Sequence, residues 1–278
     1  MMKKKLGAFF ILIIMTICHV EAAVDKNKIA YGEDPNQYGE LYLPKEQAKG
    51  LVVMIHGGYY QPQYTLSYLE PATLDLVARG YAVWSIEYRR MTQGGGWKTT
   101  SQDILAAINH IDDISAQYRL PKNIVLVGHS VGGQFALWAA SRAKQPSDTF
   151  GMLKPKISGV VSIAGVSDLL LLDKGHRSAQ RDTPITQFIG ADPTEASDIL
   201  KKISPIELLP LGIKQILIHG DMDISVPVGV SYLYRDKAVA AGDDVTLVVL
   251  PLADHFTLLD PALPFWQETV SAIDTLAK

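Results

Sequence analysis

Ser130 is the residue whose surroundings most clearly favour chemistry. Residues 128–132 read GHSVG and fit the pattern G-x-S-x-G, directly after a short apolar run at 124–127. A buried strand that turns sharply into a helix needs glycines where side chains would collide, and it places the serine at the positive end of the helix. We therefore predict that Ser130 is a nucleophile; the alternative is a structural turn between a strand and a helix.

A serine nucleophile needs a general base, and the chain has seven histidines. His255 follows the last apolar run, residues 245–250, and it comes late in the chain, as the order serine, acid, histidine requires. The other histidines lie in the N-terminal segment, in glycine-rich motifs, in an expected helix, in a polar insertion and at the end of an expected strand. We predict that His255 is the base; a histidine in a surface loop is the alternative.

The segment HGDMDISVP, residues 219–227, supplies a carboxylate for this histidine. A third group must hold the imidazole in one tautomer and stabilise its charge. We assign this role to Asp223, with Asp221 as the alternative that would otherwise brace the turn. Two carboxylates beside His219 also suggest a metal, but no HExxH or comparable ligand cluster accompanies them, so we predict neither a metal nor a cofactor.

The glycines of His-Gly-Gly at 56–58 follow another apolar run, residues 51–55. Acyl transfer requires backbone N–H groups that stabilise the negative oxygen of the tetrahedral intermediate, and glycine leaves their approach open. We predict an oxyanion hole from the N–H groups near Gly58 and of Val131, the residue after the serine. His56 is expected to support the loop by hydrogen bonding. An ordinary turn is the alternative for the glycine pair.

In combination these motifs resemble the α/β-hydrolase superfamily. They are HGG at 56–58, GHSVGG at 128–133, HGDMDISVP at 219–227 and DHF at 254–256. The resemblance covers essentially the whole chain after its N-terminal segment. It implies the roles of nucleophile, acid and base for Ser130, Asp223 and His255.

Within that superfamily, the chain is similar to small carboxylesterases related to feruloyl esterases and kynurenine formamidases. Four segments carry this similarity: YGEDP at 31–35, LYLP at 41–44, HGGYY at 56–60 and SIEYRR at 85–90. The chain departs from the pattern at Tyr60, where many relatives have tryptophan. In the last segment, Glu87 and an arginine are expected to brace the end of a strand rather than to clamp a charged substrate.

Three residues are assigned to the substrate pocket: Tyr59, Trp97 and His129. Trp97 ends the glycine-rich loop at 92–97, and a packed surface aromatic is an equal alternative for it. The insertion at about 169–210, rich in charged and turn residues, is predicted to form a small cap over the serine.

Apolar runs of strand length alternate with amphipathic segments along the chain. Strands are expected at 40–43, 51–55, 81–86, 124–127, 159–163, 215–219 and 245–250, and helices at about 68–79, 101–118, 228–241 and 264–277 and directly after Ser130. This alternation predicts an α/β fold with a mostly parallel central sheet and helices on both faces. The family resemblance implies that the fold is of the α/β-hydrolase type. The predicted site residues all fall where such sheets bind ligands, beyond the carboxyl ends of the strands.

The N-terminus has the form of a secretory signal. Three lysines at 3–5 precede an apolar run at 6–18, and Val20 and Ala22 are small or uncharged residues at the positions that permit cleavage after Ala22. We predict export to the periplasm or the medium, with residues 23–278 as a single domain; a retained N-terminal anchor is the alternative. Cys18 is the only cysteine, so the mature domain would contain no disulfide.

Charge and composition exclude some classes of partner. Removal of the signal leaves 23 basic and 28 acidic residues, with no basic cluster that would bind nucleic acid. We expect a small-molecule ester or amide substrate and no stable membrane insertion after cleavage; the sequence does not indicate the oligomeric state. The expected activity is that of an exported serine hydrolase acting on carboxylic esters. An arylformamidase or peptidase with the same triad, and a catalytically silent binding protein, are the alternatives.

Overall fold

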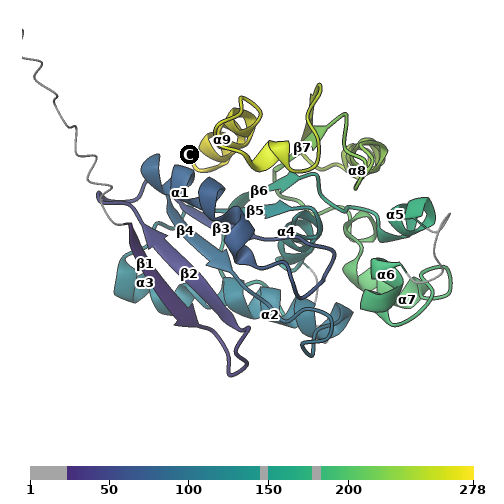
Figure 1. Ribbon diagram of the computed structural model, residues 1–278, viewed down its shortest axis with the longest axis horizontal. Helices are drawn as coiled ribbons and strands as arrows, with labels where there is room; N and C mark the ends of the chain where they lie inside the picture. Colours follow the sequence, from purple (N-terminus) through teal and green to yellow (C-terminus); the bar gives the residue numbers. More distant parts are fainter. Residues whose placement is uncertain (1–23, 145–149, 177–182) are drawn as a thin grey trace, which may run out of the picture.

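The computed structural model describes residues 24–144, 150–176 and 183–278, and the predicted signal at 1–22 lies outside these ranges. The described part contains one eight-stranded sheet in the order β1-β2-β4-β3-β5-β6-β7-β8 (Figure 1). Strands β3 to β8 run parallel, and β1 and β2 are antiparallel to their neighbours. The bounds are β1 Asp25–Ala30, β2 Tyr38–Leu43, β3 Leu51–Ile55, β4 Ala82–Ile86, β5 Ile124–His129, β6 Ile157–Ile163, β7 Gln215–Gly220 and β8 Val245–Leu250.

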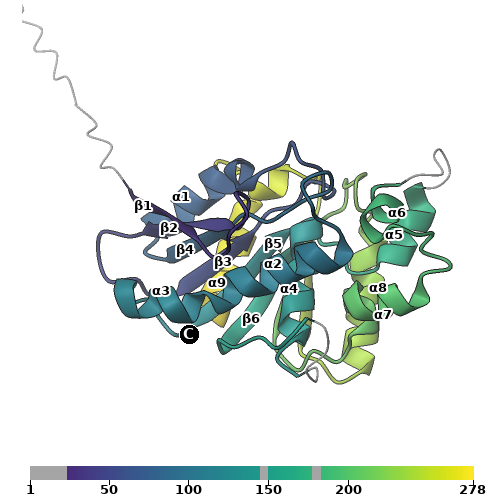
Figure 2. The same cartoon turned by 90° about the horizontal axis from the view of Figure 1, so that it is seen from below.

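Helices cover both faces of the sheet. Figures 1 and 2 show α1 and α9 on one face and α2, α3 and α4 on the other. The helices of the described part are α1 Glu70–Ala78, α2 Trp97–Asn109, α3 Ile111–Tyr118, α4 Val131–Ser141, α5 Leu169–His176, α6 Pro184–Ile189, α7 Ser197–Ile203, α8 Gly229–Ala240 and α9 Trp266–Leu276, with 3₁₀ turns η1 Leu66–Leu69, η2 Pro205–Glu207 and η3 Thr257–Leu259. The predicted α/β-hydrolase arrangement is therefore confirmed.

The central strands are buried on both faces, which explains why they read as apolar runs. Along β3, Leu51, Val53 and Ile55 pack into one core, whereas Val52 and Met54 pack into the other. Successive side chains of a strand point to opposite faces of a sheet. A strand between two helical layers must therefore be apolar at every position.

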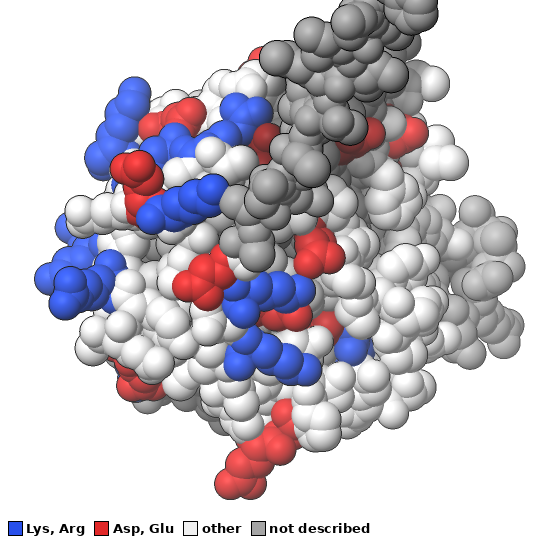
Figure 3. Space-filling model, turned by 60° about the vertical axis from the view of Figure 1, so that its left-hand side comes forward, with Lys and Arg blue, Asp and Glu red and all other residues white. Residues whose placement is uncertain are grey.

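Strand β1 has no counterpart in the sequence prediction. Its residues DKNKIA are mostly exposed, and it pairs with β2 alone at the edge of the sheet. Lys26 binds Glu40 and Glu70 at 2.8 and 3.0 Å, and the ammonium of Lys28 lies 3.6 Å from the centre of the Tyr38 ring. Positive and negative side chains alternate over this side of the molecule (Figure 3). Lysines on an edge strand discourage pairing with another chain, at the cost of the apolar pattern that reveals a strand.

Two predicted helices differ in detail from those observed. The segment expected at 68–79 begins as η1, and α1 starts at Glu70 because Pro71 suits the first turn of a helix. The long helix expected at 101–118 is two helices, α2 and α3, which meet at His110. These differences leave the order of elements unchanged.

The insertion predicted as a cap contains α5, α6, α7 and η2. These elements lie together at one end of the sheet, beside α8 (Figures 1 and 2). Phe188 of α6 is buried and stacks on Tyr60 at 3.7 Å between ring centres, with an interplanar angle of 5°. The insertion is thus packed into the core next to the loop that follows β3.

Candidate active site

Ser130 occupies a sharp turn between β5 and α4. Its backbone has φ 59° and ψ −123°, a left-handed conformation that few residues other than glycine adopt. The neighbouring glycines permit it: a Cβ atom on Gly128 would lie 2.0 Å from the carbonyl oxygen of Gly132, and one on Gly132 would lie 2.1 Å from that of Ile55. The turn is further held by the hydrogen bond from the Ser130 N–H to the Ile163 carbonyl, 2.9 Å.

Asp223 and His255 meet beyond the ends of β7 and β8. His255 Nδ1 lies 2.6 Å from Asp223 Oδ2, and Asp223 Oδ1 accepts the N–H groups of Ser225 and Val226 at 2.8 Å each. Burial alone would raise the pKa of the Asp223 carboxyl, but hydrogen bonds from His219 and His255 hold it well below its usual range. Asp223 is therefore an ionised acceptor, and His255 donates its Nδ1 proton to it.

Ser130 and His255 line the same pocket of about 150 Å³. Within the described part of the chain, no hydrogen bond joins the Ser130 hydroxyl to the His255 ring. Contacts of this kind are often loose before substrate binds. The three residues predicted as nucleophile, acid and base thus come together at one edge of the sheet, with Asp221 outside the cluster, where its Oδ1 accepts the Leu252 N–H at 2.7 Å.

Two backbone N–H groups beside Ser130 are available to a ligand. Among the residues that the structure describes, those of Gly58 and Val131 donate no hydrogen bond; Val131 is the first residue of α4, where no intrahelical acceptor exists. The loop that carries Gly58 lies against the serine, since a Cβ atom on Gly57 would be 2.8 Å from Ser130 Cβ. This arrangement can stabilise an oxyanion at Ser130.

Aromatic residues form most of the pocket wall. Tyr59, Tyr64, Tyr68 and Phe256 line it together with Ser225 and the catalytic candidates. The Tyr59 hydroxyl donates to the Ser225 carbonyl at 2.9 Å, so it bridges the loop after β3 to the loop that holds Asp223. The substrate space is accordingly small and largely apolar.

Of the residues assigned to the substrate pocket, Trp97 lies outside it and His129 lies in its wall. Trp97 does not line it; the ring lies edge-on to Phe150, with centres 5.9 Å apart. His129 does contribute to the wall but is only 2% exposed, and both its ring nitrogens are engaged by protein groups, Tyr68 Oη at 3.1 Å and the His255 carbonyl at 2.9 Å. Neither side chain presents a free polar atom of its ring to the pocket.

His219 is a supporting residue that the sequence prediction left at a strand end. Its ring is fully buried, with Nε2 2.7 Å from the Val226 carbonyl and 3.4 Å from Asp223 Oδ2, and with Nδ1 2.7 Å from Ser231 Oγ. It therefore fixes the turn that presents Asp223. In the sequence, this supporting role could have been inferred from the position of His219, directly after an apolar run and four residues before Asp223.

His56 supports the loop after β3, as expected. Its Nε2 lies 2.8 Å from Glu87 Oε1, an atom that also binds Arg90 at 2.8 Å, and its ring stacks on Tyr88 with centres 4.2 Å apart. Burial opposes ionisation of Glu87, but His56 and Arg90 hold the pKa of its carboxyl below the usual value. The predicted brace between Glu87 and an arginine is present, and its arginine is Arg90.

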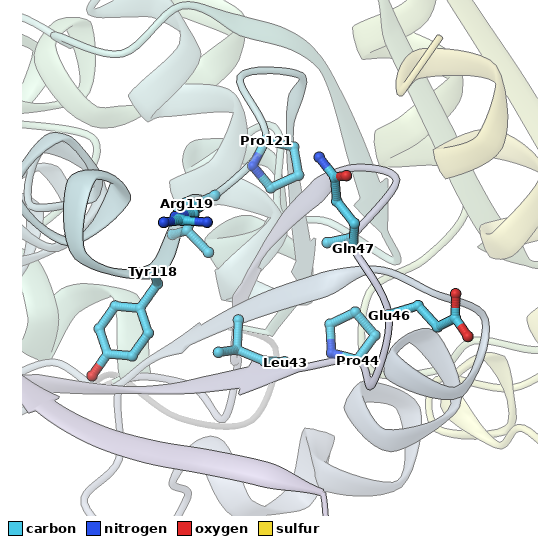
Figure 4. A pocket seen from close by; sticks show the side chains of 9 residues that line it. Leu43, Pro44, Glu46, Gln47, Tyr118, Arg119 and Pro121 are labelled. Atoms are coloured by element: carbon cyan, nitrogen blue, oxygen red, sulfur yellow. The ribbon is translucent and has the colours of Figure 1, made fainter.

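A second pocket, of about 350 Å³, lies at the opposite edge of the sheet, where β2 ends and β5 begins. Figure 4 shows Tyr118 and Arg119 on one side of this pocket and Gln47, Pro44 and Glu46 on the other. It contains no serine, cysteine or histidine among its lining residues. The predicted nucleophile and base, Ser130 and His255, line the pocket at the other end of the strands instead.

Two further features can be stated for the described ranges, one on metal ligands and one on helix length. No group of three or more His, Cys, Asp or Glu side chains there is placed to hold a metal ion. Of the helices in the same ranges, none is long and apolar enough to cross a membrane.

The sequence matches the model of the BD-FAE family over residues 40–237, which is most of the chain. The chain belongs to the BD-FAE family. This is a feruloyl-esterase type of α/β hydrolase, and membership places the chain among carboxylic-ester hydrolases. The matched range includes the loop at Gly58, the turn at Ser130 and the Asp223 loop, whereas His255 lies beyond it. No curated protein sequence matches the chain.

Solved structures similar to this BD-FAE family member share its fold. A bifunctional GH43-CE protein of Bacteroides eggerthii superimposes with a TM-score of 0.77 and 22% identity over 91% of this chain, which spans only 38% of that protein. A truncated carbohydrate esterase from gut microbiota superimposes with a TM-score of 0.76 and 24% sequence identity. The match covers 92% of this chain and 96% of the esterase. Esterase B of Lactobacillus rhamnosis superimposes with a TM-score of 0.79 and 18% sequence identity. The match covers 91% of this chain and 86% of esterase B.

Proposed function

We propose that this protein is an exported serine hydrolase that cleaves carboxylic esters through an acyl-enzyme on Ser130. One observation carries the proposal: His255, whose Nδ1 lies 2.6 Å from Asp223 Oδ2, lines the same pocket as Ser130, a serine with a positive backbone φ. A nucleophile, a base and a group that orients the base are the elements that such a reaction needs. Membership of an esterase family supports the same reading.

Acylation begins when the Ser130 hydroxyl attacks the ester carbonyl. His255 Nε2 takes the hydroxyl proton, and Asp223 stabilises the imidazolium that forms. The carbonyl oxygen becomes an oxyanion, which the N–H groups of Gly58 and Val131 receive. When the tetrahedral intermediate collapses, the bond to the leaving alcohol breaks and His255 returns the proton to that alcohol.

Deacylation repeats these steps with water. His255 removes a proton from a water molecule, which attacks the acyl carbonyl, and the oxyanion again lies at Gly58 and Val131. Collapse breaks the bond to Ser130 Oγ, and the proton passes from His255 back to the serine. The acid leaves, and the free enzyme is restored.

The surroundings of the pocket favour an ester of a sugar with a short acyl chain. A neighbouring groove of about 430 Å³ shares Tyr64, Tyr68 and Phe256 with the pocket and adds Asp260. Phe256 is 59% exposed, so it offers a flat apolar face, and Asp260 offers a carboxylate to hydroxyl groups. Two of the similar structures are described as a carbohydrate esterase and a GH43-CE protein, which supports this choice. The pocket at Ser130, about 150 Å³, fits a small acyl group.

The activity is tested with acetyl, butyryl, feruloyl and formyl substrates, including an acetylated xylose and N-formylkynurenine. We expect hydrolysis of the esters, with acetyl preferred, and its abolition in Ser130→Ala. A fluorophosphonate probe should label wild-type protein at Ser130 and leave the variant unlabelled. Full activity in Ser130→Ala, or no labelling of the wild type, would contradict the assignment; turnover of the formamide alone would indicate the arylformamidase alternative.

Export is tested separately, by expressing the full chain and sequencing the N-terminus of the exported protein. Cleavage after Ala22 predicts that it begins at Ala23, in the periplasm or the medium. Exported material that begins at Met1 would instead indicate a retained N-terminal segment.

A further inference from the structure

A chain of hydrogen bonds connects the loop at the oxyanion hole to the base. The Gly57 N–H donates to Tyr68 Oη, and Tyr68 Oη lies 3.1 Å from His129 Nδ1. The other ring nitrogen, His129 Nε2, lies 2.9 Å from the backbone carbonyl of His255. Four segments that are distant in sequence are joined: the loop after β3, η1, the end of β5 and the loop after β8.

The direction of each hydrogen bond follows from the groups at the two ends. The His255 carbonyl can only accept, so His129 carries its proton on Nε2, and Nδ1 must accept. Tyr68 therefore donates its hydroxyl proton to Nδ1, and its oxygen accepts the Gly57 N–H. Each donor in this series of hydrogen bonds has one acceptor, and this holds only while the His129 ring is neutral. Burial, together with the nearby His255, lowers the pKa of His129 to about 3, which agrees with a neutral ring.

Both ends of this series of hydrogen bonds lie beside the atoms expected to do the chemistry. Gly57 precedes Gly58, the expected oxyanion donor, and the His129 and His255 rings lie 4.6 Å apart at an angle of 50°. The backbone at Gly57 is also closely packed against both neighbours, because a Cβ atom there would lie 2.9 Å from Tyr68 Oη and 2.8 Å from Ser130 Cβ. A shift at either end would therefore change the distance between the oxyanion donors and the base.

We propose that Tyr68 and His129 are positioning residues that set the oxyanion hole and the general base relative to one another. Neither of them contacts the reacting atoms in this role; they act through Gly57 and through the backbone of His255. The inference rests on the proposed function. It assigns His129 to positioning rather than to substrate binding, and it gives Tyr68 a role beyond that of a pocket wall.

The test compares Tyr68→Phe, His129→Leu, His129→Gln and the double variant Tyr68→Phe/His129→Leu on the best ester. Glutamine places its amide nitrogen where Nε2 stood, so it can still donate to the His255 carbonyl, whereas leucine cannot. Titration with a fluorophosphonate counts competent serines, and kcat is expressed per titrated site, which removes any contribution from misfolded protein. Tyr234→Phe is the matched control, because its buried hydroxyl donates to Gln215 Oε1 at 2.7 Å, outside the site.

We expect kcat to fall about tenfold or more in Tyr68→Phe and His129→Leu with KM changed by less than about twofold, since misplacement of catalytic groups raises the barrier without removing binding contacts. His129→Gln should recover most of the loss. The double variant should be no slower than the slower single variant, because both changes break one chain. Tyr234→Phe should retain its kcat.

An unchanged kcat in Tyr68→Phe would overturn the proposal, and so would losses of kcat that multiply fully in the double variant. It would also be overturned if kcat fell equally in His129→Gln and His129→Leu. A loss of kcat in Tyr234→Phe as large as that in Tyr68→Phe would overturn it as well. Ester hydrolysis by the wild type is measured first. A wild type that hydrolyses no ester contradicts the proposed function, whereas an active wild type with unaffected variants contradicts only the positioning role.

Discussion

The Nδ1 atom of His255 lies 2.6 Å from Oδ2 of Asp223, although the two residues are 32 positions apart and follow different strands. The second carboxylate oxygen accepts two backbone N–H groups at 2.8 Å each, from Ser225 and Val226. Because both oxygens are engaged, the carboxylate has little freedom to turn. It fixes His255 in the tautomer whose Nε2 can accept the proton of Ser130.

Replacing Asp223 by asparagine should preserve the fold and almost abolish turnover. An amide at this position can present its NH₂ group to Nδ1 and so favour the wrong tautomer of His255, and changes of this kind reduce kcat by a factor of about 10⁴. The measurement is kcat for the best ester near neutral pH. Asp221→Asn is the matched control, since its remaining oxygen can still accept the Leu252 N–H outside the triad. Comparable activities of the two variants would contradict the role of Asp223.

Much of this site could be predicted because its signals are local. A turn as tight as that at Ser130 needs glycines at fixed positions, and an apolar strand followed by a polar loop marks each of Asp223 and His255. The order of these motifs along the chain then selects among the histidines. Each of these features depends on a short run of consecutive residues, so a single sequence is enough to find it.

The parts that the sequence did not reveal depend on contacts between distant segments. Strand β1 forms through its pairing with β2, and four of its six residues are polar or charged. The partners of Tyr68 and His129 lie 11 to 126 positions away, and nothing in the spacing of these residues indicates them. Trp97 likewise packs on Phe150, a residue beyond three intervening elements. Supporting contacts of this kind follow from the assembled fold alone.

Acid should destabilise the folded protein partly through His129. Its pKa in the folded state is about 3, below the ordinary value of 6.5, so between these values the unfolded chain binds a proton that the folded protein does not. Stability is therefore fully present above about pH 6.5 and decreases as the pH falls toward 3, by about 1.4 kcal/mol per pH unit for this group. We expect about 2 kcal/mol of the loss between about pH 7 and pH 5 to come from this residue.

Urea unfolding of the wild type and of His129→Gln at both pH values measures this contribution. The variant lacks the titrating ring, so the wild type should lose about 2 kcal/mol more than the variant between the two conditions, even where the variant is less stable at pH 7. An equal loss of unfolding free energy in both proteins would show that His129 is not the group responsible.

The ring of Tyr59 should limit the size of the acyl group. It lines the pocket, and its hydroxyl is tied to the Ser225 carbonyl at 2.9 Å, so the wall cannot easily move aside. Tyr59→Gly removes the ring at a residue with φ 52°, where glycine is conformationally favourable. The ratio of kcat/KM for p-nitrophenyl butyrate to that for the acetate should rise by about tenfold or more, as added space for methylene groups allows.

Tyr59→Phe is the control for the wall itself. It keeps the ring in the pocket and loses only the hydrogen bond to Ser225, so its preference between butyrate and acetate should change far less than that of the glycine variant. If the glycine variant shows the wild-type ratio, the acyl group lies elsewhere in the pocket.

The backbone of Ser130 should reduce the stability of the protein in return for a well-placed nucleophile. A residue with a side chain at φ 59° and ψ −123° costs on the order of 1–3 kcal/mol, and glycine avoids most of this cost. Ser130→Gly and Ser130→Ala both remove the hydroxyl and should both abolish hydrolysis, but only glycine relieves the backbone. We therefore expect the glycine variant to unfold at a higher urea concentration than the alanine variant, by about 1 kcal/mol or more in free energy. Equal midpoints would mean that the turn at Ser130 is held without strain, and that the geometry of the nucleophile costs the fold nothing.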